Sequence, residues 1–103
     1  MVVGLDKYRS VTKTNFIREN LVEFVTESTE LFNIIQNSID TTIDFLYKAK
    51  RTDRYILMKD CRIIKISNYK DEIYTIRFEY GQNIHMDKIQ LRLFKLKNYI
   101  LND

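Results

Sequence analysis

Residues 14–50 of the chain read TNFIRENLVEFVTESTELFNIIQNSIDTTIDFLYKAK, and the apolar residues of this stretch recur at helical spacing. Steps of three, four and seven residues place large apolar side chains on one side of an α-helix. The acidic residues Glu19, Glu23 and Glu30 fall on the other side. The pattern therefore predicts an N-terminal helical segment whose apolar side consists of Ile17, Leu21, Phe24, Leu31, Ile35, Ile39 and Leu46.

The length of this segment leaves two arrangements open. One helix over the whole stretch would be roughly 54 Å long, whereas a compact domain of 103 residues has a diameter of roughly 33 Å. The helix could break near Gln36–Thr41, where Asn37 and Ser38 are weak helix formers, and Thr41 with Asp44 could cap a second short helix. Alternatively, one long helix could pair with a second copy of the chain as a coiled coil.

The second half of the chain changes to the period-two pattern of β-strands. Residues 72–80 are the clearest example, because Tyr74, Ile76 and Phe78 alternate with polar side chains. Further strands are expected at 55–58, 61–66, 84–86 and 89–97, although residues 94–101 could instead form a short helix. We therefore predict one α+β domain over residues 1–103, with the N-terminal helical segment packed on a C-terminal antiparallel meander of three or four strands.

The sequence contains no pattern typical of a catalytic, metal or phosphate site. Cys61 and His85 are the single cysteine and the single histidine, and one residue of each kind does not make a zinc site. We expect Cys61 to be a structural or incidental cysteine and His85 to lie at the surface. The two glycines, Gly4 and Gly81, cannot form a glycine-rich phosphate loop. We expect no enzyme activity, no cofactor and no metal.

Composition also bears on location and origin. No apolar run approaches the roughly 20 residues that a transmembrane helix requires, and residues 1–5 are too short for the apolar part of a signal peptide. We therefore expect a cytoplasmic protein with no membrane partner. Isoleucine, asparagine, lysine and tyrosine are frequent while alanine occurs once, at Ala49. That bias is typical of an AT-rich coding sequence and favours a viral or mobile-element origin.

The charge distribution supports a nucleic-acid hypothesis. Residues 51–103 contain eleven Lys or Arg and seven Asp or Glu, a formal charge of +4. Cations at the polar positions of neighbouring strands could contact phosphates, although strands with one hydrated side often have such residues. The proposed DNA- or RNA-binding residues are Arg62, Lys65, Arg77, Lys88, Arg92, Lys95 and Lys97.

A protein-interaction hypothesis is the preferred interpretation. The apolar side of the predicted helix exceeds what a small sheet could cover, so we expect a homodimer or a contact with another protein. The residues predicted for this interface are Ile17, Leu21, Phe24, Leu31 and Ile35.

One enzyme alternative comes from the order of the expected elements. A short strand, two helices and a basic meander containing Arg62–Ile64 and Ile73–Arg77 broadly resemble, over about half the chain, the small ribosome-dependent RNase toxins of the RelE type. The resemblance implies RNA cleavage on the ribosome. The Gly-Asp-Tyr-Arg-like core of that family is absent from this sequence, so the resemblance rests on element order.

Overall fold

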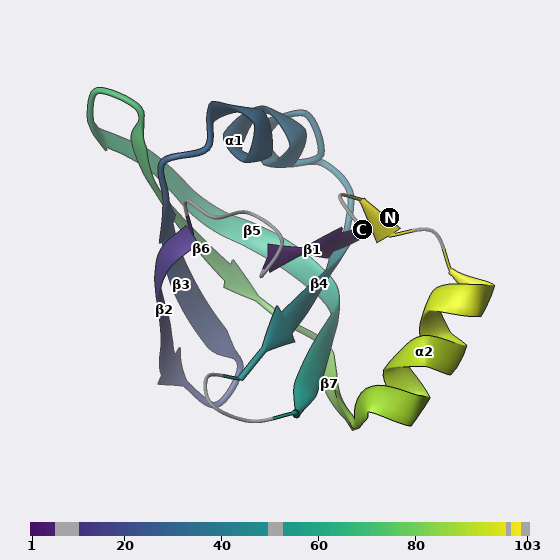
Figure 1. Ribbon diagram of the computed structural model, residues 1–103. Helices are drawn as coiled ribbons and strands as arrows, with labels where there is room; N and C mark the ends of the chain where they lie inside the picture. Colours follow the sequence, from purple (N-terminus) through teal and green to yellow (C-terminus); the bar gives the residue numbers. More distant parts are fainter. Residues whose placement is uncertain (6–10, 50–52, 99, 102–103) are drawn as a thin grey trace.

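The computed structural model describes residues 1–5, 11–49, 53–98 and 100–101, and more than half of these residues lie in β-strands. Two short helices complete the fold, α1 (Thr29–Gln36) in the middle of the chain and α2 (Lys88–Lys97) near its C-terminal end (Figure 1). The strands are β1 (Val2–Gly4), β2 (Val11–Arg18), β3 (Leu21–Thr26), β4 (Ile43–Lys48), β5 (Tyr55–Lys70), β6 (Ile73–Glu79), β7 (Gln82–Met86) and β8 (Ile100–Leu101).

The prediction of an N-terminal helical segment is wrong. Of residues 14–50, only Thr29–Gln36 form a helix, and most of the rest lie in β2, β3 and β4; residue 50 lies outside the described residues. In β3 the buried side chains alternate strictly, at Val22, Phe24 and Thr26. Valine, isoleucine, threonine and phenylalanine are common here and favour strands because their side chains suit a pleated surface. These preferences are compatible with a strand, and the pairing of β3 with β6 decides against a helix whose apolar spacing the same residues also fit.

The predicted break at Gln36–Thr41 coincides with the end of α1, but the next element is the strand β4 and not the expected second helix. The Asn37 N–H closes α1 on the carbonyl of Asn33, and the chain then turns into β4. The expected capping pair, Thr41 and Asp44, therefore has another role. Asp44 lies within β4, where its carboxylate accepts the Asp60 N–H at 2.9 Å.

The expected meander of three or four strands is also wrong, because the strands form one larger mixed sheet. The order is β2-β3-β6-β5-β4-β1-β8, and β7 pairs with β5 outside this order. Pairing is antiparallel from β2 to β4, whereas β1 runs parallel to both β4 and β8. Phe16 on β2 contacts Tyr47 on β4 with ring centroids 5.8 Å apart, although three strands separate these two in the sheet. The sheet is therefore curled, and its interior holds the main core.

A kink within β5 lies opposite the link between β6 and β7. The first part of β5 pairs with β4 and β7, and its second part pairs with β6. Asp60 lies between the two parts with a φ of 56°, and Gly81 lies opposite, where its N–H donates to the Lys59 carbonyl at 2.9 Å. A Cβ at Gly81 would lie 3.3 Å from the Cβ of Asp60. Glycine thus permits the close approach at the kink.

The main core fills the inside of the curled sheet, and α1 covers one end of it (Figure 1). Phe45 contacts both Phe24 and Phe78, with ring centroids 5.9 and 4.7 Å apart. Leu31 and Ile35 of α1 are fully buried against this cluster. The core also contains Val3, Leu5, Val22, Ile43, Met58, Cys61, Ile63 and Ile76.

A second, smaller cluster fixes α2 to the outside of the sheet. Leu91 is the buried residue of α2, and Phe94 packs beside it. Their partners come from four strands: Val2, Leu46, Tyr55, Leu57 and Met86. A strand at 89–97 was expected, but Asp87 and Gln90 form a capping box that starts a helix instead. In Figure 1, α2 stands at the side of the sheet.

Candidate docking surface

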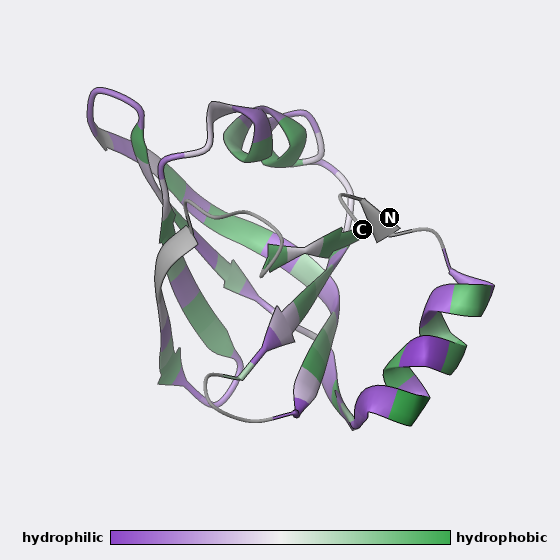
Figure 2. Ribbon diagram, viewed as in Figure 1, coloured by the Kyte–Doolittle hydropathy of each residue, from purple (hydrophilic) through white to green (hydrophobic). Residues whose placement is uncertain are grey.

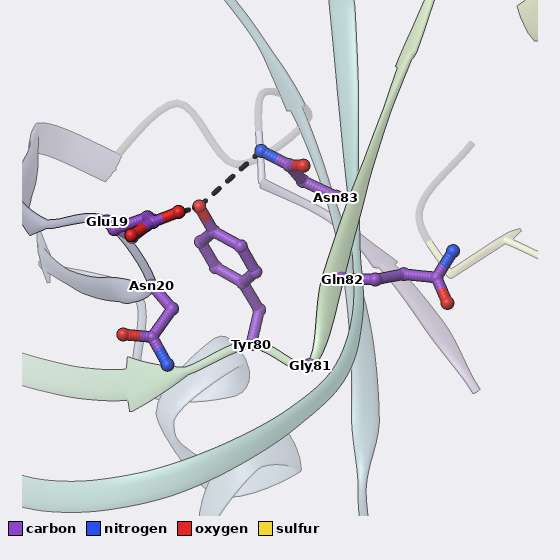
Figure 3. Close-up of a pocket in the computed structure, with 6 residues that line it drawn as sticks. All are labelled: Glu19, Asn20, Tyr80, Gly81, Gln82 and Asn83. Carbon is purple, nitrogen blue, oxygen red and sulfur yellow. Dashed lines mark hydrogen bonds between the residues drawn. The ribbon is translucent and has the colours of Figure 1, made fainter.

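A polar hollow lies where the β2–β3 turn meets the link between β6 and β7 (Figure 3). Its volume is about 480 Å³, and it is lined by Glu19, Asn20, Tyr80, Gly81, Gln82 and Asn83. The Tyr80 hydroxyl donates to the Glu19 carbonyl, and the Asn83 side-chain amide donates to the same hydroxyl at 3.4 Å. The Tyr80 N–H donates to the Asn20 carbonyl at 3.1 Å. These hydrogen bonds hold the β2–β3 turn against the β6–β7 link. The polar residues that line the hollow therefore have a structural role.

The single cysteine is part of the hydrophobic core and not of an accessible site. Cys61 is fully buried in the main core, and its thiol donates to the Met58 carbonyl at 3.2 Å. Burial, assisted by the nearby carboxylates of Asp44 and Asp60, raises the pKa of the Cys61 thiol from 9.0 to about 12. A thiol needs its thiolate form to act as a nucleophile, so Cys61 is inert at neutral pH. His85 is exposed on β7, outside this core.

The residues that the structure describes form neither a metal cluster nor a helix that could cross a membrane. No group of three or more His, Cys, Asp or Glu side chains there is arranged to hold a metal ion. No helix in the same part of the chain has the length and apolar character needed to cross a bilayer.

The cations predicted to bind nucleic acid on the sheet are largely paired with acids. The Arg77 guanidinium donates through Nε and Nη2 to one carboxylate oxygen of Glu23, at 3.2 and 2.9 Å. Arg62 lies 4.0 Å from the Glu79 carboxylate. Lys65 is exposed beside Arg77 in the β5–β6 register. Carboxylates therefore neutralise much of the charge that phosphates would need.

The other four predicted cations do not belong to the same surface. Lys88, Arg92, Lys95 and Lys97 all lie on α2, whereas Arg62, Lys65 and Arg77 lie on β5 and β6. Lys88 is 3.4 Å from the Asp53 carboxylate. The structure thus divides the seven residues into a sheet group and a helix group.

The residues predicted for a helical interface are also divided. Phe24, Leu31 and Ile35 are fully buried in the main core, so no partner reaches them while the chain keeps this fold. Leu21 is half-buried on β3, and Ile17 is exposed at a bulge of β2. The long helix that would have aligned these five side chains does not exist, and the structure does not bring them together.

An apolar surface that the sequence analysis missed lies on α2. Ile89, Leu93 and Leu96 are 70%, 55% and 79% exposed, the three highest values among the large hydrophobic residues that the structure describes. We name these three residues the outer ridge. At 100° per residue they point about 160° away from Leu91 and Phe94, which pack on the sheet. Figure 2 shows hydrophobic and hydrophilic positions alternating along α2.

Basic residues flank the outer ridge on both sides. Arg92 and Lys97 lie about 70° to either side of its centre by helical geometry, and both are exposed. The sequence signal for this surface was present in the Asp87–Gln90 capping box and in the four- and seven-residue steps from Ile89. Alternation at Ile89, Leu91 and Leu93 obscured it, because the same residues also fit a strand.

Comparisons with family models, with curated proteins and with solved structures found no match for this chain.

Proposed function

We propose that this chain is a non-enzymatic binding protein and that the outer ridge of α2 is its docking surface for another protein. The observation that supports the proposal is the exposure of Ile89, Leu93 and Leu96 on the side of α2 that faces away from the sheet. A folded domain rarely leaves large aliphatic side chains grouped in water, and such groups usually mark interaction sites. Isolated exposed hydrophobic residues, by contrast, are ordinary.

Rigid attachment of α2 favours docking. The helix starts at a capping box and is fixed at its middle by Leu91 and Phe94. The chain pairs with the sheet on both sides of α2, through β7 before it and β8 after it. A helix held in this way is ordered before binding, so association does not cost the entropy of forming it.

The alternatives from the sequence have less support. Nucleic-acid binding would require a continuous basic surface on the sheet. The seven cations instead lie in two groups, and Arg77 and Arg62 have acidic partners. The likeness to RelE-type toxins rested on two helices before a meander, an order that this fold does not have. Homodimerisation through a long N-terminal helix is not supported, because residues 14–49 form strands and one short helix.

Site-specific photocrosslinking in living cells tests the proposal. A benzoylphenylalanine in place of Leu93 should give a discrete protein adduct on irradiation, because this position lies at the centre of the docking surface. Ile39 is the matched control, since it is an exposed aliphatic residue in the turn after α1. The same substitution there should give no such adduct. Absence of an adduct at position 93, or the same adduct at both positions, would overturn the proposal.

A further inference from the structure

We infer that the occupant of the outer ridge is a protein with an apolar groove whose two rims are acidic. The inference rests on the proposed function and adds the chemistry of the partner. It follows from three properties of α2: the spacing of its anchors, the sign of its charges and the way it is held.

The spacing of the ridge residues fits a groove. Leu93 and Leu96 follow Ile89 by four and seven residues, which is the anchor spacing of an amphipathic helix that lies in a groove of its partner. The three anchors span about 10 Å along the helix axis. The opposite side of α2 is occupied by the sheet through Leu91. Only the ridge and its flanks therefore remain for a partner, and a convex ridge is complementary to a concave apolar surface.

The charges of α2 specify the rims. The helix contains four cations and no acidic residue over Lys88–Lys97. Lys88 is engaged with Asp53 at 3.4 Å. Within the described part of the chain, neither Arg92 nor Lys97 takes part in an ion pair. Since these two flank the ridge on opposite sides, a partner gains complementary charge only with carboxylates on both rims of its groove.

The same charges disfavour a second copy of this chain as the occupant. Two ridges in a symmetric contact would bring the cations of one α2 against those of the other, and like charges oppose such pairing. The ridge is also unsuited to phosphates, which contact cations and backbone amides and have no use for three aliphatic side chains.

An anionic membrane would meet the same residues, but the structure favours a protein. Interfacial helices bind lipid through a wide apolar side that often contains Trp or Phe and sinks several ångströms below the headgroups. Here the exposed apolar side consists of three aliphatic residues on a helix of ten residues. The aromatic residue of α2, Phe94, is instead packed against the sheet.

The experiment begins with the adduct formed at position 93. Its protein partner is identified by mass spectrometry and purified, and the affinity for the full chain is measured by calorimetry at 50 and 300 mM salt. Arg92→Glu/Lys97→Glu should weaken binding at least tenfold at low salt and reduce the salt dependence. Lys65→Glu/Lys70→Glu is the matched control, because it makes the same charge change at exposed positions of β5 and should change affinity less than threefold. Leu93→Gln should also weaken binding at least tenfold.

Each outcome decides one claim. Loss of affinity in the Arg92/Lys97 variant alone, with no binding to vesicles containing 30% phosphatidylserine, supports an acidic groove. If the two charge variants lose affinity equally, or if neither loses affinity, the inference of an acidic groove is overturned. The adduct at position 93 would still support the proposed function in that case. An adduct with a second copy of the chain, or vesicle binding lost with Leu93→Gln, would also overturn it. A missing adduct removes the proposed function itself.

Discussion

The curled sheet and α2 differ in how far their large apolar side chains are buried. Inside the sheet, the three contacting rings of Phe24, Phe45 and Phe78 are fully buried, and α1 adds two more buried side chains. Along α2, Leu91 is buried, whereas the three residues of the outer ridge are mostly exposed. The sheet thus holds most of the stabilising burial, and α2 has apolar surface left over. This contrast separates residues that maintain the fold from residues available for binding.

The largest expected effect tests the sheet side of the contrast. Phe45→Ala removes the ring that contacts both Phe24 and Phe78, and it should lower the free energy of unfolding by about 3–5 kcal/mol, since a buried cavity remains. Leu96→Ala, at the most exposed position of the ridge, should change it by less than about 0.5 kcal/mol. Urea denaturation followed by circular dichroism measures both. Similar losses in the two variants would remove the contrast.

A pair of variants within α2 sharpens the comparison on a single helix. Leu91→Ala empties the contact with the second cluster and should destabilise the chain by about 2 kcal/mol, near the low end for buried leucine because this cluster is small. Leu93→Ala, two residues along, should cost less than about 0.5 kcal/mol. Hydrogen exchange should show faster exchange of the α2 amides in Leu91→Ala, with the main-core strands still protected.

How far the sequence predicts these two regions differs for physical reasons. The alternation of Tyr74, Ile76 and Phe78 was enough to place β6 and its buried face, as the structure shows. Within residues 14–50, the same apolar residues satisfied both a helical and a strand pattern. Tertiary pairing with β6 decided in favour of the strand β3, and no local signal contains that pairing. The outer ridge was missed because Ile89, Leu91 and Leu93 also fit a strand, and which side of α2 faces the sheet depends on residues far away in sequence.

The stability of the chain at alkaline pH tests whether the Cys61 thiol inside the sheet is shielded from water. Folding raises the pKa of the Cys61 thiol from 9.0 to about 12, so the unfolded chain loses this proton at lower pH than the folded chain does. The resulting stability is complete below pH 9 and is lost as the pH rises towards 12. Relative to Cys61→Ala, the free energy of unfolding of the wild type should fall by about 1.4 kcal/mol for each pH unit in that window.

Subtracting the Cys61→Ala curve removes the titration of tyrosines and lysines, which both proteins share. Chemical denaturation at pH 8, 9 and 10 provides the measurement. A constant difference between the two proteins over this range would show that the thiol is solvated, and the main core would then be less closed than its burial indicates.

The smallest effect concerns an ion pair between two neighbouring strands of the sheet, β3 and β6. The Arg77–Glu23 pair has good geometry, with two donors on one oxygen, but both side chains are partly exposed. A double-mutant cycle with Arg77→Ala and Glu23→Ala should therefore give a coupling energy of about 0.5 kcal/mol that decreases in 1 M salt. A coupling of several kcal/mol that salt does not affect would mean that this ion pair is shielded from water. Then α2 would no longer be the distinctive exposed surface, and the outer side of β3 and β6 would be the better place to look for a partner.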